Sequence, residues 1–128
     1  GGFMQPQGHF QVISNLIDRG MDPQRALDAP RFCIWSDLEG GAPPEHSESV
    51  LLIEDQHRVE EVVQDLRMKH GQKRVDIVRG HERAVFGRGQ IIYRDPANGV
   101  LWGGSDPRAD GCAVGLECEP NRGVKSKL

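Results

Sequence analysis

The chain has 128 residues, a formal net charge of -3 and a hydrophobic fraction of 37%, and sixteen of its residues are glycine. This length has room for one modest core, so we expect no second folded domain. The small negative charge and the lack of a Lys–Arg block give no reason to expect nucleic acid as a partner. No apolar run approaches the roughly 20 residues of a membrane span, and the first residues show no secretory signal.

The cysteines and histidines predict neither a disulfide framework nor a metal site. Cys33, Cys112 and Cys118 form no Cys-x-x-Cys pair, and their odd number argues against a closed set of disulfides. The five histidines are scattered along the chain, whereas a zinc site needs Cys and His at ligand spacing. We therefore expect reduced, structural thiols and no metal or other cofactor.

The first 32 residues predict two helices joined by a glycine turn. Gly20 suits a helix C-terminus, where a positive φ is favoured. Asp22 and Pro23 are typical of the N-cap and first position of a second, short helix, which Pro30 ends. The first helix has apolar residues at spacings of three and four, which mark one face of an amphipathic helix: Phe10, Ile13, Leu16 and Ile17, with Val12 beside them.

Two glycines, Gly1 and Gly2, open the chain ahead of the first helix. Backbone N–H groups at such a point can face an anion, although a glycine pair also makes ordinary turns. His9, near the helix start, is a candidate general base. Histidines in this position are more often structural, so we do not assign it a catalytic role.

The rest of the chain predicts strands, one helix and turns, in a mixed α/β (α+β) order. The acidic stretch 36–48 is typical of a loop, and its carboxylates are better explained as solvated than as acid–base groups. Gly-Arg-Gly at 87–89 lacks the residues of a phosphate-binding loop and suits strand glycines packed closely against another backbone. The predicted elements are strands 33–35, 50–54 and 75–78, a helix at 57–70, and a hairpin that joins 90–94 to 100–103.

The Ser-Asp-Pro-Arg turn at 105–108 has two interpretations. It could contribute to a catalytic triad, but the nearest histidine in the sequence, His81, has nothing to position it. We favour a turn held by a hydrogen-bonded pair of Asp106 and Arg108. Arg31 is likewise expected to form a structural ion pair with an inward-facing carboxylate.

Two separate motifs resemble the C-terminal part of the γ-glutamyltransferase (γ-glutamyltranspeptidase) family. The motif near the end of the chain is Gly-Gly-Ser-Asp-Pro-Arg at 103–108, followed by Ala-Asp-Gly-Cys-Ala-Val-Gly at 109–115. Gln-Pro-Gln-Gly-His at 5–9 resembles the acylase-like subgroup. The resemblance covers residues 1–115 and implies a partial αββα sandwich of the N-terminal-nucleophile hydrolase type, with 116–128 as a flexible tail. The motif at the start of the chain comprises Gly1, Gly2, Gln11, Asn15, Ile17, Asp18, Gly20, Ala26 and residues 29–32.

The resemblance implies a particular chemistry. Enzymes of this family cut their own precursor and attack a γ-glutamyl amide with the exposed N-terminal threonine. This chain contains no threonine, so the nucleophile would lie upstream, in the remainder of the precursor. Gly1 and Gly2 match the glycine pair whose N–H groups stabilise the oxyanion. Phe3-Met4-Gln5 replaces the small or basic residues common in the family, so acyl groups other than γ-glutamyl could be accepted.

The expected partners are therefore the upstream segment or large subunit and a small γ-glutamyl or related acyl amide, such as glutathione. A non-catalytic scaffold or binding module derived from the family is the alternative, and a truncated product without function is a third interpretation. The chain begins with glycine, which indicates processing or a piece of something longer. Ser126-Lys127-Leu128 resembles a peroxisomal address read by an import receptor. We expect peroxisomal localisation, or otherwise cytoplasmic.

Overall fold

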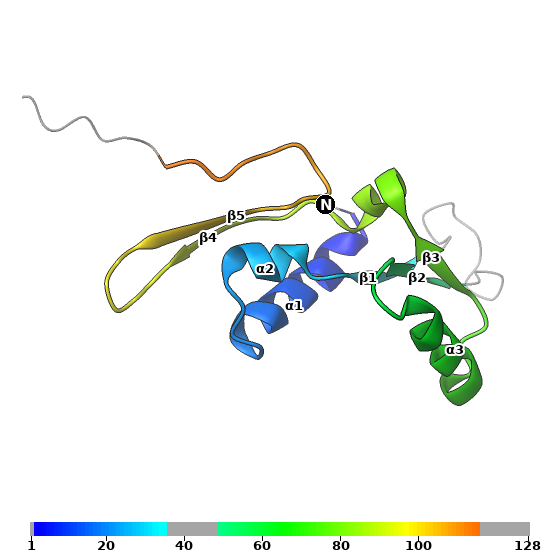
Figure 1. Ribbon diagram of the computed structural model, residues 1–128. Coiled ribbons are helices and arrows are strands. Elements are labelled where there is room, and N and C mark those ends of the chain that lie inside the picture. Colours follow the sequence, from blue (N-terminus) through cyan, green and yellow to red (C-terminus); the bar gives the residue numbers. More distant parts are fainter. Residues whose placement is uncertain (1, 36–48, 116–128) are drawn as a thin grey trace, which may run out of the picture.

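The computed structural model describes residues 2–35 and 49–115 and has the predicted mixed α/β composition (Figure 1). The acidic stretch 36–48, predicted as a loop, lies outside the described residues. In chain order the elements are α1 (Met4–Ile17), α2 (Pro23–Asp28), β1 (Phe32–Trp35), β2 (Val50–Glu54), α3 (Val59–His70), β3 (Val75–Val78), the 3-10 helix η3 (Gly80–Phe86), β4 (Gln90–Arg94) and β5 (Leu101–Ser105).

The strands β1, β2 and β3 form one sheet in that order. β1 and β2 are antiparallel, with Phe32 opposite Ile53, and β2 and β3 are parallel, with Leu51 opposite Val75. A parallel pair needs a crossover connection, and α3 provides it. α3 ends at Gly71, whose φ of +66° is the left-handed value that favours glycine.

Two hydrophobic clusters lie on opposite faces of this sheet, because neighbours along a strand point to opposite sides. The first joins Ile53 and Val75 to Val59 and Val63 of α3. The second joins the start of α1 to the other face and to the end of η3. Its buried members are Met4, Cys33, Val78 and Phe86. The sheet is therefore covered by α3 on one face and by the start of α1 and the end of η3 on the other.

α1 begins at Met4, well ahead of Phe10, the first residue of the apolar pattern, so the Gln-Pro-Gln-Gly-His run is helical. Pro6 is tolerated because the N–H groups of a first helical turn have no partner within the helix. Much of the predicted apolar face is exposed: α1 buries Met4 and Asn15, whereas Phe10 and Ile17 are 71% and 75% exposed.

The second sheet is the hairpin of β4 and β5, which projects from the rest of the molecule (Figure 1). The residues at 87–89 precede the strand rather than forming part of it. The close approach to another backbone occurs instead at Gly104, where a Cβ would lie 2.8 Å from the carbonyl carbon of Pro23. Gly104 therefore lets β5 pack directly on α2.

Candidate functional site

Gly2 lies immediately before α1 and has a φ of +65°. A Cβ built on it would meet nothing within 4 Å, so it is the backbone conformation, not lack of space, that favours glycine there. Its carbonyl accepts a hydrogen bond from the Gln5 N–H at 3.2 Å, which begins the first turn. The first turn of α1 contains no acidic residue, so no carboxylate of that turn offsets the positive end of the helix dipole.

Contacts of the two residues that follow Gly2 hold it in place. The ring of Phe3 packs edge-on against Trp35 of β1, with 4.4 Å between ring centroids. The next residue, Met4, is 5% exposed and belongs to the second hydrophobic cluster. The start of α1 is thus held to the end of β1 and to the sheet.

Two glutamines one turn apart fasten α1 along the free edge of β1. The Gln7 side chain accepts from the Ile34 N–H at 2.8 Å and donates to the Ile34 carbonyl at 3.2 Å. Gln11 makes the same pair of bonds to Phe32, at 3.0 and 2.8 Å. The amides thereby satisfy strand N–H and C=O groups that a neighbouring strand would otherwise bind.

A third glutamine does the same for the hairpin. Gln24 of α2 accepts from the Ser105 N–H at 3.0 Å and donates to the Ser105 carbonyl at 2.9 Å. Together with the contact at Gly104, these bonds attach β5 to α2.

A buried cluster of charged side chains joins five segments that lie far apart in the sequence. Asp106 accepts from Arg31 Nη1 and from the Gly89 N–H, each at 2.8 Å, and from Arg108 Nη1 at 3.0 Å. Arg31 also donates to the Phe86 carbonyl at 2.7 Å and to the Leu27 carbonyl at 3.0 Å. The predicted Asp106–Arg108 pair and the predicted Arg31 ion pair are both confirmed.

Glu54 is the second acid of this cluster and was not anticipated. Its carboxylate accepts from Arg108 Nε at 2.8 Å, from Arg83 Nε at 2.6 Å and from the Arg31 N–H at 2.9 Å. Arg108 further binds it through Nη2 and donates to the carbonyls of Leu27 and Ala29. The only sequence signal was an acidic residue ending an otherwise apolar strand.

Hydrogen bonding decides the ionisation of this cluster. Burial disfavours the charged form of Glu54, but hydrogen bonds from Arg108, Arg31 and Arg83 outweigh it and hold the pKa of Glu54 below its ordinary value. Burial likewise disfavours ionised Asp106, and bonds from the Gly89 and Arg108 N–H groups, with the Arg31 charge, lower its pKa. Both carboxylates are therefore ionised near neutral pH and act as structural anions rather than as acid–base groups.

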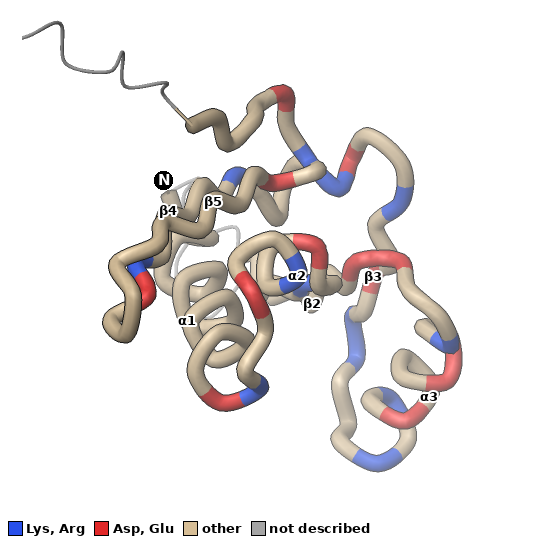
Figure 2. The backbone as a smooth tube through the Cα atoms, turned by 60° about the vertical axis from the view of Figure 1, so that its left-hand side comes forward, with Lys and Arg blue, Asp and Glu red and all other residues tan. Residues whose placement is uncertain are grey.

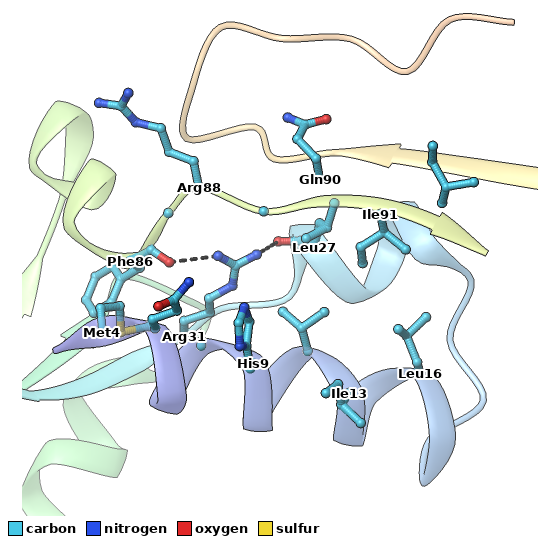
Figure 3. A pocket seen from close by; sticks show the side chains of 16 residues that line it. Met4, His9, Ile13, Leu16, Leu27, Arg31, Phe86, Arg88, Gln90 and Ile91 are labelled. Carbon is cyan, nitrogen blue, oxygen red and sulfur yellow. Dashed lines mark hydrogen bonds between the residues drawn. The ribbon is translucent and has the colours of Figure 1, made fainter. Parts of the chain in front are cut away.

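A cavity of about 490 Å³ lies between α1 and the start of β4 (Figure 3). Its walls include Val12, Ile13 and Leu16 of α1 and Ile91 of β4. Arg31 lines it too, and Nε of Arg31 is buried with no hydrogen-bond partner among the described residues.

The other predicted site residues are not brought together. His9 is exposed beside the cavity, and the turn at 105–108 is the structural pair described above. Gly1 and the predicted address Ser126, Lys127 and Leu128 lie outside the described residues, so these assignments stay predictions. Within residues 2–35 and 49–115, no three His, Cys, Asp or Glu side chains are grouped to hold a metal ion. The described helices include none long and apolar enough to cross a membrane.

Comparison with known proteins decides the family. Residues 1–116 match the family described as gamma-glutamyltranspeptidase. The chain belongs to the gamma-glutamyltranspeptidase family. The resemblance of its two end motifs to this family is thereby confirmed.

Two relatives support an acylase-like member of the gamma-glutamyltranspeptidase family. The glutathione hydrolase-like YwrD proenzyme of Bacillus subtilis strain 168 is 34% identical over 116 residues, which are 91% of this chain and 20% of that protein. The crystal structure of cephalosporin acylase from Bacillus halodurans is 42% identical with a TM-score of 0.73, covering 93% of this chain and 19% of that one. This likeness confirms the α+β fold class.

A gamma-glutamyltranspeptidase from Pseudomonas nitroreducens shares the fold at 17% identity, with a TM-score of 0.53 over 86% of this chain and 49% of that one. The chain spans about a fifth of the length of the B. subtilis and B. halodurans relatives.

Proposed function

We propose that this chain is the C-terminal part of an N-terminal-nucleophile enzyme that hydrolyses or transfers γ-glutamyl or related acyl groups from amides, glutathione among them. An upstream threonine would attack the amide carbonyl carbon, form an acyl-enzyme ester and release the amine. Water or a second amine would then take the acyl group. Membership of the family and the similarity to a cephalosporin acylase support this proposal.

One observation carries the role of this chain in that reaction. Gly2 combines a positive φ with a place directly before a helix whose first turn has no acidic residue. Preorganised N–H donors there would stabilise the negative oxygen that forms when the threonine attacks. Gly1 and Gly2 are the proposed donors, and the rest of the chain holds them in position.

The test uses the precursor that contains this chain, assayed with γ-glutamyl-p-nitroanilide, glutathione and an N-acyl cephalosporin. Gly2→Ala is compared with Gly20→Ala, a matched control, because Gly20 has a φ of +62° and equally open surroundings. Alanine keeps the backbone N–H but disfavours the positive φ of Gly2, so displacement of the donor is expected to lower kcat in Gly2→Ala alone, by up to about 10²–10³. Equal activity in the two variants would exclude the oxyanion role, and a processed precursor that turns over none of the amides would favour a non-catalytic scaffold.

A further inference from the structure

The buried ion pair of Arg31 and Asp106 holds both ends of the segment 86–89. Arg31 Nη1 donates to the Phe86 carbonyl at 2.7 Å and to Asp106 Oδ2 at 2.8 Å. The same Asp106 oxygen accepts from the Gly89 N–H at 2.8 Å. These bonds form one continuous chain from the Phe86 carbonyl to the Gly89 N–H. The position of Phe86 is therefore set by two charged side chains that are themselves buried.

The ring of Phe86 carries that position to the start of α1. Its side chain is 1% exposed and is the largest of the fully buried side chains in the described part of the chain. Phe86 belongs to the same hydrophobic cluster as Met4, the first residue of α1, and both line the cavity (Figure 3). Because protein interiors are close-packed and transmit strain, a displaced Phe86 ring would shift Met4 and, with it, the backbone at Gly2.

The first turn of α1 carries no charged side chain that could hold it in place. The helix Met4–Ile17 contains no Lys, Arg, Asp or Glu, whereas α3 carries both signs along its length (Figure 2). The glutamine bonds to β1 begin at Gln7, about one turn beyond Met4. The first turn therefore depends on packing, and Phe86 is the member of its cluster that the ion pair holds.

We propose that Phe86 is a positioning residue for the oxyanion donor at Gly2 and acts on it through Met4. The catalytic role of Gly2 rests on the proposed function, whereas its position depends only on the packing. A buried ion pair contributes little net stability, so holding Phe86 gives the Arg31–Asp106 pair a second role, in placing this donor. A misplacement of about 1 Å can lower the rate of an enzyme by about 10²-fold.

The test compares two substitutions that each remove buried apolar volume, made in the precursor that contains this chain. Phe86→Leu alters the cluster that includes Met4. Val63→Ala is the matched control, because Val63 is buried in the cluster on the opposite face of the sheet. The constants kcat and KM are measured with γ-glutamyl-p-nitroanilide, glutathione and an N-acyl cephalosporin. Hydrogen exchange of the Gln5 amide, which donates to the Gly2 carbonyl, reports the first turn without any turnover and is read by fragmentation mass spectrometry.

We expect Phe86→Leu to lower kcat by at least about tenfold with little change in KM, because a displaced donor weakens binding of the transition state alone. Val63→Ala should leave both constants nearly unchanged, and the Gln5 amide should exchange faster only in Phe86→Leu. Phe86→Met, whose flexible side chain refills part of the space, should lie between Phe86→Leu and the wild type.

Equal kcat values, or equal Gln5 exchange rates, in Phe86→Leu and Val63→Ala would overturn the proposal. A rise in KM with kcat unchanged would also overturn it, because that pattern indicates uniform binding rather than placement of an oxyanion donor. A wild type that turns over none of the amides would refute the proposed function, and the Gln5 exchange rates alone would then decide whether Phe86 positions Gly2.

Discussion

Arg31 and Asp106 lie 75 residues apart in the chain and form an ion pair with 2.8 Å between Nη1 and Oδ2. Their side chains are 3% and 0% exposed, so neither charge has access to water. Such a pair contributes little net stability compared with apolar packing, but removing one partner leaves the other as an uncompensated buried charge. The fold therefore depends on keeping both.

Replacing Asp106 by Asn tests this dependence. The substitution leaves the Arg31 and Arg108 guanidinium groups short of one buried anion, and we expect the free energy of unfolding to fall by about 3–5 kcal/mol. Urea unfolding followed by circular dichroism measures the change. Asp110→Asn is the control, because Asp110 is exposed. Equal midpoints for the two variants would contradict a structural role for the pair.

The cluster also predicts how stability depends on pH. The pKa values of Glu54 and Asp106 are lowered in the folded state, whereas unfolded Glu and Asp titrate at about 4.3 and 3.9. Their contribution is therefore fully present above about pH 5 and is lost as the pH falls through the folded pKa values. Urea unfolding between pH 7 and pH 3 should show a decline that begins near pH 5 and is smaller in Asp106→Asn. A wild-type free energy unchanged down to pH 3 would be inconsistent with this.

The buried thiol of Cys33 should react far more slowly than the exposed thiol of Cys112. Burial raises the pKa of Cys33 to about 11, so its thiolate is about two orders of magnitude scarcer at pH 8 than that of an ordinary cysteine. This group favours the folded state below pH 8.5, and that contribution is lost as the pH rises toward 11. Iodoacetamide labelling of a Cys118→Ser chain, read by mass spectrometry, compares the two sites. In concentrated urea both should label at the same rate, and equal rates without urea would refute the prediction.

The stability that each glutamine contributes by bonding to β1 should be measurable by a single substitution. Gln11→Met removes one donor and one acceptor from Phe32. Because water can partly replace them at this exposed edge, we expect a loss of about 1–2 kcal/mol and faster hydrogen exchange of the Phe32 amide. Gln64→Met on the exposed face of α3 is the control and should change neither quantity. An unchanged Phe32 exchange rate would mean that the edge is held by other contacts.

Local patterns predicted most of the elements. β2 and β3 follow from compact apolar runs, and the hairpin follows from the Asp95–Gly99 turn, in which the Gly99 N–H donates to the Asp95 carbonyl at 2.8 Å. Asp22 caps α2 as its sequence indicates, accepting from the Arg25 N–H at 2.9 Å. These features depend on neighbours within a few residues, which a sequence displays directly.

Features that depend on distant partners were not predictable in the same way. The apolar spacing in α1 identified its apolar residues correctly. Periodicity does not show, however, which face of the helix its neighbouring segments cover. Met4 and Asn15 are buried because β1 and α2 lie against them, as the Asn15 bond to the Ala26 carbonyl shows. The paired amides of Gln7 and Gln11 carry a weak signal, their spacing of four, but nothing local names Ile34 and Phe32 as their partners.

The position of Arg108 has a consequence for the order in which the protein can form during synthesis. Its guanidinium binds Glu54, Asp106 and the carbonyls of Leu27 and Ala29, so it completes a cluster whose other members come mostly from much earlier in the chain. Until Arg108 has left the ribosome, Glu54 lacks its principal cation and the end of α2 lacks two donors. Translation therefore delays final packing of the segment that begins with Gly2 until nearly all of residues 2–108 have emerged, and a ribosome stalled before that point would expose an unfinished nascent domain to chaperones and proteases.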